Sequence, residues 1–495
     1  MEKKVEMREF SLEKKLREEK IHMRSGLEIH QQLDSGKLFC RCPSILRNEK
    51  GDWIVKRKLH AVAGESGEVD IAAKHEIEKD KEFIYEGFRD SCCLVEFDEQ
   101  PPLEIDQEAL KIAVQIALLL NCEVLNVTQI MRKTVLNGSN TSGFQRTAMI
   151  ARDGFLETSF GRVGIDNIFL EEDSARPANS KDEGDPELEN SKVYKLDRLG
   201  IPLVEIATGP HMYYPEQVKE AALKLGEILR ACKVKRGIGT IRQDLNISTP
   251  NHVRVEIKGF QDPKMMIETI EKEIKRQNAE GKKGKQEVRK ANVDGTTSFL
   301  RPMPGAARMY PETDLPLLHI SRDFINEVKK SLPKLKTEIA GELKARGLNE
   351  DMIKLLLESG MLNEFEVLLK IYANPNFVAK LLLVLPKEIA SHEKVNANIF
   401  SVDILESVLS AIASKKISEN DVKHVLEKIA KGSSVHDALK IEKIESSDME
   451  GEIAKIVKEK PGLNANAYMG LVMAKFKGKV DGKTVMEILK KLVKS

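Results

Sequence analysis

Three short stretches that alternate between apolar and polar residues constrain the fold of this chain more than any other feature. They are "GLEIHQQL" (26–33), "TIRQDLNIS" (240–248) and "HVRVEIKGF" (252–260). Successive side chains of a strand point to opposite faces, so each stretch predicts one strand of a sheet with a buried face and a polar face. The chain must therefore build a sheet that covers a core on one side only.

The first of these strands has an unusual polar face. Leu27 and Ile29 take the buried face, whereas Glu28, His30 and Gln32 share the other. A carboxylate and an imidazole side by side on one strand are the side chains that a metal or catalytic site needs.

Helical patterns surround and follow the predicted strands. "QEALKIAVQIALLL" (107–120) has the length and apolar density of a buried helix, and 214–232 carries a clean apolar stripe behind Pro215. Residues 25–318 therefore predict a mixed α/β domain. Beyond residue 319 helical stripes such as 349–372 dominate, which predicts an all-α remainder.

The overall charge balance limits the function classes. The chain has 495 residues with Lys+Arg 79 and Asp+Glu 78, a net charge of +1, which excludes a globally basic nucleic-acid coat. The end of the chain (474–495) is locally basic and could meet RNA phosphates, although such runs are more often solvated faces. The first 20 residues predict a solvated helix, not a targeting peptide. With no bilayer-length apolar run, we expect a cytoplasmic protein without a membrane association and with reduced thiols.

Five apolar, strand-like stretches of the first domain each carry a carboxylate. If they converge, their acids and one imidazole form an oxygen-rich site suited to Mg²⁺. The candidate ligands are Glu28, His30, Glu172, Glu205 and Asp244. The alternative is that each acid simply lies on the wet face of a sheet, because exposed acids are ordinary surface.

Two further segments, 131–154 and 297–318, are open to two interpretations, and two others predict loops. Residues 131–154 could bring backbone N–H groups to a phosphate or form a polar hairpin, and the spacing of a P-loop is absent. Residues 278–295 predict a flexible connector and 177–192 a mobile loop. The proline-rich stretch 297–318 predicts a stiff segment that either crosses between domains or lines a cleft with Arg301 and Arg308.

The cysteines invite a zinc interpretation only weakly. Cys40 and Cys42, with Cys92 and Cys93, could supply four thiolates, but CxxC spacing is missing and adjacent cysteines seldom bind one metal together. Buried or free thiols are the simpler interpretation, so we expect zinc to be unlikely.

Several motifs occur together in a recognisable order. They are "GLEIHQQLDSGKLFCRCPS", "RKTVLNGSNTSGFQRT", "LEEDSAR", "LDRLGIPLVEIATGP", "GTIRQDLNIS", "RVEIKG" and "RPMPGAARMYPETDLP". In this order they resemble the GatB/GatE family of tRNA-dependent amidotransferases over almost the whole chain. "EIHQQLD", "CCLVEFDEQPP" and "DGTTSFLRPMPGAARMYPETD" resemble its archaeal GatE branch more than its bacterial GatB branch.

The resemblance implies an architecture and a reaction. It implies a cradle-type catalytic domain (1–318), a helical domain (319–398) and a helical tail that reaches tRNA (399–495). The implied reaction converts misacylated Glu-tRNA(Gln) to Gln-tRNA(Gln) with ATP and Mg²⁺ through a γ-glutamyl phosphate. The ammonia would come from an asparaginase-like partner, GatD, in a heterodimer or heterotetramer.

The resemblance also assigns residues. Glu28, His30 and Glu172 match catalytic positions, and Glu28, His30, Glu172, Glu205 and Asp244 match acidic, metal-binding positions of the family's pocket. By their chemistry, Lys133, Arg242 and Lys258 are expected to bind the phosphates of the nucleotide.

One departure and three alternatives remain. Members of the GatE branch carry an inserted domain before "DGTT", and here only a short connector (278–291) takes its place. The alternatives are a GatB-type enzyme acting on Asp- or Glu-tRNA, a catalytically idle tRNA-binding module, and an ATP-grasp-like ligase for a small molecule.

Overall fold

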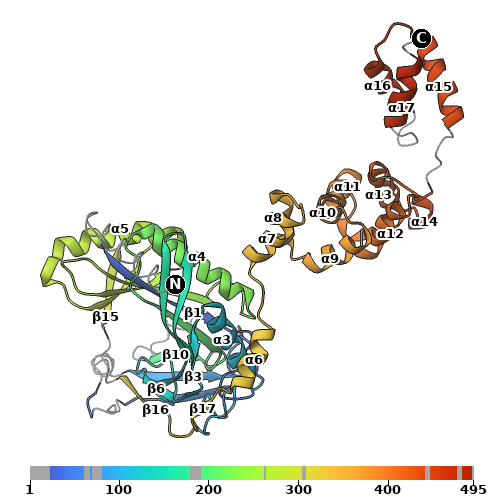
Figure 1. Cartoon of the computed structure of the whole chain (residues 1–495). Helices are drawn as coiled ribbons and strands as arrows, with labels where there is room; N and C mark the ends of the chain where they lie inside the picture. Colours follow the sequence, from blue (N-terminus) through green and yellow to red (C-terminus); the bar gives the residue numbers. More distant parts are fainter. Residues whose placement is uncertain are drawn as a thin grey trace. The chain divides into compact units, whose positions relative to one another are not determined.

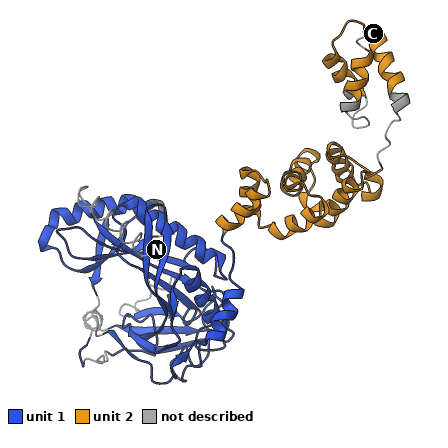
Figure 2. Ribbon diagram, in the orientation of Figure 1, with its two compact units in different colours: residues 1–335 blue, residues 336–495 orange. Residues whose placement is uncertain are grey.

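The structure is a computed structural model that divides into two compact units, residues 1–335 and 336–495 (Figure 2). It describes residues 23–60, 67–69, 81–178, 191–260, 263–303, 308–440, 446–475 and 482–492. The predicted N-terminal helix and most of the predicted loop 177–192 lie outside these residues. The first unit is mixed α/β and the second is helical (Figure 1), so the predicted fold class is confirmed.

The first unit is built on a sheet that has eleven strands among the described residues. Its spatial order is β15 (Thr297–Pro302), β14 (Glu287–Ala291), β13 (Val255–Phe260), β12 (Ile241–Ser248), β1 (Arg24–Gln32), β11 (Pro202–Thr208), β8 (Gly161–Glu172), β7 (Phe144–Thr158), β6 (Ile130–Thr134) and β16 (Met309–Pro311), with β4 (Glu123–Val124) paired to β7. All neighbours pair antiparallel except β13 and β14. Strand β1 therefore lies in the middle of the sheet.

The described residues of the first unit also form two smaller sheets and a helix near its end. The smaller sheets consist of β2 (Trp53–Arg57), β3 (Glu82–Gly87), β10 (Ser191–Lys195) and β9 (Arg176–Pro177), and of β17 (Leu318–His319) with β5 (Val127–Thr128). Helix α6 (Arg322–Lys330) packs on α3 (Gln107–Leu119) and buries Val328 in the main core. The first unit consequently extends beyond the predicted limit at residue 318.

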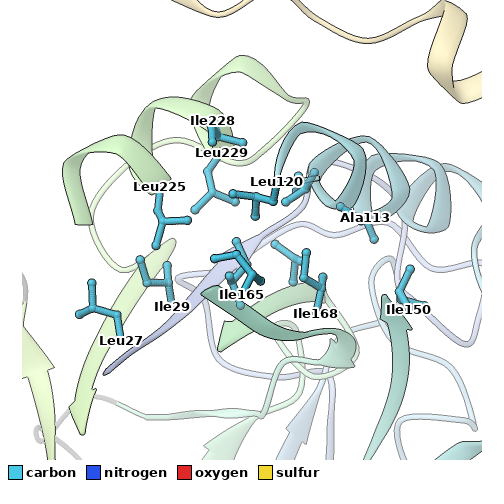
Figure 3. Close-up of a cluster of buried hydrophobic side chains, with 14 of the residues drawn as sticks. Leu27, Ile29, Ala113, Leu120, Ile150, Ile165, Ile168, Leu225, Ile228 and Leu229 are labelled. Carbon is cyan, nitrogen blue, oxygen red and sulfur yellow. The ribbon is translucent and has the colours of Figure 1, made fainter. Parts of the chain in front are cut away.

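Three helices cover one face of the large sheet. Helix α3 packs against β7 and β8, and α4 (Pro215–Ala231) packs against β1 and β7. Helix α5 (Pro263–Glu280) packs against β13. Figure 3 shows Leu225 and Leu229 of α4 above Leu27 and Ile29 of β1. The core thus lies between these helices and the apolar face, and the polar residues of the central strands face the other way.

The helices predicted at 107–120 and 214–232 are confirmed, and their ends follow from local chemistry. The side chain of Asp106 accepts a hydrogen bond from the backbone N–H of Ala109 at the start of α3, and Pro215 occupies the first turn of α4. The three alternating stretches form β1, β12 and β13, although Val253 lies before β13 and is exposed. Segment 131–154 forms the hairpin β6–β7.

The prediction of a flexible connector at 278–295 is wrong. Helix α5 continues to Glu280, a turn of 3₁₀ helix follows at Gly281–Lys283, and β14 then joins the sheet beside β13. Two of the charged side chains of β14 that made the segment look like a loop are paired: Arg289 contacts Glu287 of β14 and, at 4.0 Å, Glu273 of α5. Charge pairing across elements cannot be read from local composition.

The described residues of the second unit form two hydrophobic clusters. The first is built by α7 (Lys336–Ala345), α8 (Glu350–Ser359), α9 (Leu362–Ile371), α10 (Pro375–Leu383), α11 (Leu385–Glu393), α12 (Val402–Ala413), α13 (Val422–Ala430) and α14 (Val435–Ala438), with 3₁₀ turns at Ala397–Ile399 and Glu419–Asp421. The second is built by α15 (Ser446–Glu459), α16 (Ala465–Lys475) and α17 (Gly482–Leu492). The predicted division at 398/399 falls inside the first cluster.

The predicted helical stretch 349–372 is interrupted once. It forms α8 and α9, and Gly360 between them has φ of 74°, a left-handed conformation that ends α8 at little cost for glycine. Within the part of the chain that the structure describes, none of the helices combines the length and apolarity needed to cross a bilayer.

Candidate active site

A row of ionisable side chains lies on the polar face of the central strands. Strand β1 pairs with β11 so that His30 stands opposite Glu205, and with β12 so that Glu28 stands opposite Asp244. Directly opposed residues of antiparallel strands share a face and lie about 5 Å apart. The register therefore brings together four of the five predicted metal ligands, and they come from three neighbouring strands.

His30 is the centre of this row. Its Nε2 atom lies 3.2 Å from Oε2 of Glu205 and 3.6 Å from Oε1 of Glu28. Two groups of potential ligand atoms, each within 4.8 Å of one another, share this histidine: Glu28–His30–Asp244 and His30–Glu171–Glu205. Carboxylate oxygens completed by an imidazole are a donor set that suits a hard divalent cation such as Mg²⁺.

The protonation of this row controls whether it can hold a cation. The Nδ1 atom of His30 is buried and has no hydrogen-bond partner among the described residues, an arrangement that costs free energy unless a ligand satisfies it. Burial raises the pKa of Glu28 to about 7, and the charge of Glu205 adds to the rise. Burial also acts to raise the pKa of Glu205, but Lys133 and His30 outweigh it and hold that pKa below its usual range.

Two predicted phosphate-binding lysines neutralise the row. Lys133 Nζ lies 2.6 Å from Glu171 Oε1 and 3.5 Å from Glu205 Oε2. Lys258 Nζ lies 2.7 Å from Asp244 Oδ2 and 2.5 Å from Glu256 Oε1. Although burial opposes it, these acids raise the pKa of both lysines, so both ammonium groups stay charged next to the candidate metal ligands.

The structure separates Glu172 from this row. Its carboxylate accepts hydrogen bonds from the backbone N–H of Arg146 (3.0 Å) and from Nη1 of the same residue (3.4 Å). Arg146 in turn donates to Glu312 at 2.8 Å. Glu172 therefore belongs to a buried ion-pair network, and its neighbour Glu171 takes the place beside His30 and Glu205.

Sequence reasoning overlooked Glu171, Glu256 and Asp173. A signal for Glu171 was present in the sequence. The apolar residues Ile168 and Leu170 occupy alternate positions of β8 and are fully buried, so Glu171 falls on the opposite face. Continuing the alternation places Glu172 on the apolar side and Glu171 on the polar side. A signal for Glu256 was also present, because it alternates with the apolar Val255 and Ile257 along β13, whereas Asp173 follows β8 and meets its partners through loop contacts that the sequence does not display.

Arg242, the third predicted phosphate-binding residue, stands opposite His30 on β12. Its Nη1 and Nη2 atoms both lie 3.2 Å from Oδ1 of Asp173, and its side chain is 42% exposed. Of the five donors of its guanidinium, those not directed at Asp173 have no partner among the described residues. Arg242 thus combines proximity to the candidate metal ligands with free donors.

A second group of potential ligands comprises Cys40, Cys42, Cys93 and Glu96, whose ligand atoms lie within 4.8 Å of one another. Glu96 also accepts a hydrogen bond from Cys40 Sγ (3.0 Å) and pairs with the buried Lys37 (3.0 Å). Cys92 instead packs in a separate hydrophobic cluster, so adjacent cysteines need not share one metal. Four such donors suit tetrahedral zinc. The expectation that zinc is unlikely stays a prediction, although Glu96 takes the place of Cys92 among the four potential ligands.

Comparison with known proteins identifies the two parts of the chain separately. Residues 23–326 match the GatB/GatE catalytic domain, and residues 363–493 match the GatB domain. The matched catalytic segment contains every residue of the row described above.

The chain is also similar to complete proteins of archaea. Two relatives are named as the GatE subunit of glutamyl-tRNA(Gln) amidotransferase. The protein from Methanocaldococcus jannaschii is 35% identical, and the alignment covers 96% of this chain and 99% of the relative. The protein from Archaeoglobus fulgidus is 34% identical, and the alignment covers 96% of this chain and 98% of the relative. The first alignment spans 632 positions, more than the 495 residues of this chain, so that relative carries residues with no counterpart here. The predicted resemblance is thereby confirmed, and the chain belongs to the GatB/GatE family of amidotransferases.

Proposed function

We propose that this chain converts misacylated Glu-tRNA(Gln) to Gln-tRNA(Gln), with ATP activating the γ-carboxylate of the tRNA-bound glutamate. The observation that carries the proposal is the convergence of Glu28, His30, Glu171, Glu205 and Asp244 on one sheet face. A catalytically idle tRNA-binding module has no use for such a donor set. The names of the archaeal relatives favour Glu-tRNA(Gln) over the Asp-tRNA on which a GatB-type enzyme can also act.

The chemistry explains why a charge-neutralising site is needed. A carboxylate is a poor acyl donor because its leaving group would be an oxide. Transfer of the γ-phosphoryl group of ATP to that carboxylate releases ADP and gives a γ-glutamyl phosphate. Ammonia then attacks the acyl carbon, phosphate leaves, and the nitrogen loses a proton to give the amide. Phosphoryl transfer of this kind depends mainly on positioning and on electrostatic stabilisation.

Each part of the row has a task in this scheme. Glu28, His30, Glu171, Glu205 and Asp244 would hold Mg²⁺, which supplies charge neutralisation at the phosphoryl oxygens when bound. Lys133, Lys258 and Arg242 lie around these residues and would bind the nucleotide phosphates. A phosphate oxygen competes with the acids that now pair with the two lysines.

The ammonia source is proposed to be an asparaginase-like partner, GatD. Ammonia becomes ammonium at neutral pH in bulk water, so it must reach the acyl phosphate by a protected route. A cavity of about 20 Å³ is bordered by Lys37, Cys40 and Glu96 at the cysteine cluster and by Arg146 and Glu172. Its size suits a molecule no larger than water or ammonia.

The proposed function is tested with the full chain alone. Glu-tRNA(Gln), ATP, Mg²⁺ and ammonium chloride replace the partner as the nitrogen source, and the aminoacyl group is identified after deacylation. Formation of Gln-tRNA(Gln) that requires ATP supports the proposal. Absence of product both with the chain alone and with the asparaginase-like partner added would refute it.

We expect Mg²⁺ affinity to depend on pH through Glu28. Its pKa of about 7 means that the carboxylate is protonated below that value and must lose the proton to bind a cation. Affinity should therefore weaken up to about tenfold per pH unit below pH 7 and level off above it. Calorimetric titration with MgCl₂ from pH 5.5 to 8.5 measures this, and a constant affinity across that range would contradict it.

The end of the chain is proposed to bind tRNA. Helices α15–α17 have their own core, which includes Ile453, Tyr468 and Leu489, so removal of residues 446–495 leaves the preceding cluster complete. We expect this truncation to weaken tRNA binding about tenfold and to lessen its salt dependence. Filter binding at several salt concentrations measures both. Affinity of the truncated chain for ATP should not change, and unaltered tRNA affinity would argue against the role.

A further inference from the structure

Asp173 is a fully buried carboxylate with an unusual set of partners. It follows β8 directly, and its Oδ2 atom accepts a hydrogen bond of 2.7 Å from Nε2 of Gln32. Its Oδ1 atom accepts bonds from the backbone N–H of Ser174 (2.9 Å) and from Nη1 and Nη2 of Arg242 (3.2 Å each). Several donors therefore fix the position of this carboxylate.

The partners connect Asp173 to the candidate active site from two strands. Gln32 lies on the same face of β1 as Glu28 and His30, two residues beyond the histidine. Arg242 stands opposite His30 on β12. One buried carboxylate thus joins the end of the ligand-bearing strand to the arginine beside it.

Arg198 is a second arginine near Asp173, and its hydrogen bonds differ from those of Arg242. Its Nε atom lies 3.7 Å from Oδ2 of Asp173 but donates to the carbonyl oxygen of Ser174 at 2.7 Å, and its Nη2 atom donates to that of Ala175 at 3.0 Å. Arg198 is thus bound to the loop backbone and contributes charge to balance Asp173. Among the described residues, Arg242 has no such backbone bond.

We propose that Asp173, held by Gln32, is a positioning residue that sets the Arg242 guanidinium to bind a phosphate oxygen of the nucleotide beside the row centred on His30. This inference rests on the proposed function, because it requires ATP to bind at that row. An arginine that is already immobilised by a charged hydrogen bond loses less freedom when it binds a ligand. The exposed part of Arg242 offers the donors that the phosphate needs.

The test is a double-mutant cycle on the full chain, with calorimetric binding of the Mg²⁺ complex of a non-hydrolysable ATP analogue. We expect D173N and R242A each to weaken binding about tenfold, and D173N/R242A to bind no more weakly than R242A alone. The matched control R198K, which keeps the charge near Asp173, should bind as the wild type does. In the amidation assay the KM for ATP should rise in D173N while the KM for Glu-tRNA(Gln) stays constant.

A second variant, Q32M, tests the same inference without replacing Asp173 and so does not depend on the stability of D173N. Q32M removes the 2.7 Å hydrogen bond but keeps the volume of the side chain, and it should weaken nucleotide binding in the wild type and have no effect in R242A. Additive effects of D173N and R242A, or an equal rise of both KM values, would overturn the inference and leave the proposed function intact. A wild-type chain that binds no nucleotide at any Mg²⁺ concentration would overturn both.

Discussion

Replacement of His30 by alanine is expected to abolish the ATP-dependent amidation while the chain stays folded. His30 is common to both groups of potential metal ligands, and its Nε2 atom lies 3.2 Å from Glu205. Loss of the imidazole therefore disrupts both groups at once, and we expect the rate of Gln-tRNA(Gln) formation to fall by about a thousandfold. The isosteric change Glu28→Gln should have a similar effect, since an amide is a poor ligand for Mg²⁺.

The experiment needs a histidine control from the same unit. His319→Ala changes an exposed residue of the small sheet β17–β5 and should leave the rate unchanged. Thermal unfolding of all three variants separates a lost site from a lost fold. Near-normal amidation by folded His30→Ala or Glu28→Gln protein would refute the assignment of the row as the active site.

The sequence revealed the central part of this site because its signal is local. Glu28 and His30 alternate with the buried Leu27 and Ile29 within one strand, so their common face follows from strand geometry alone. The same reasoning holds for Asp244 on β12. Residues whose side-chain direction follows from such alternation can be predicted without knowledge of the neighbouring strands.

The remainder of the site depends on contacts between distant segments. Arg242 and Asp173 are 69 residues apart and meet only because the fold brings the end of β8 close to the start of β12. Strand β14 is polar in sequence, yet it pairs with β13 and β15, and its Arg289 lies 4.0 Å from Glu273 of α5. Neither contact leaves a periodic pattern, so the sequence predicted Arg242 as a phosphate-binding residue without its partner Asp173 and predicted 278–295 as a flexible connector.

The adjacent residues Glu171 and Glu172 allow the second large effect to be tested with matched variants. Each is changed to glutamine, so the two variants differ only in position. Glu171 lies within 4.8 Å of the ligand atoms of His30 and Glu205 and pairs with Lys133, whereas Glu172 pairs with the buried Arg146. Because the strand directs the two side chains to opposite faces, the same chemical change should have opposite consequences.

We expect Glu171→Gln to lower Mg²⁺ affinity by about a hundredfold with little loss of stability, because Lys133 keeps Glu205 as a partner at 3.5 Å. Glu172→Gln should leave Mg²⁺ affinity unchanged and lower the free energy of unfolding by about 1–3 kcal/mol, since Arg146 loses one of two buried carboxylate partners. Magnesium titration and denaturant unfolding of both variants measure the two quantities. If Glu172→Gln weakened Mg²⁺ binding and Glu171→Gln did not, Glu172 would be the metal ligand that the motif resemblance implies. The assignment of Glu171 as a metal ligand would then be wrong.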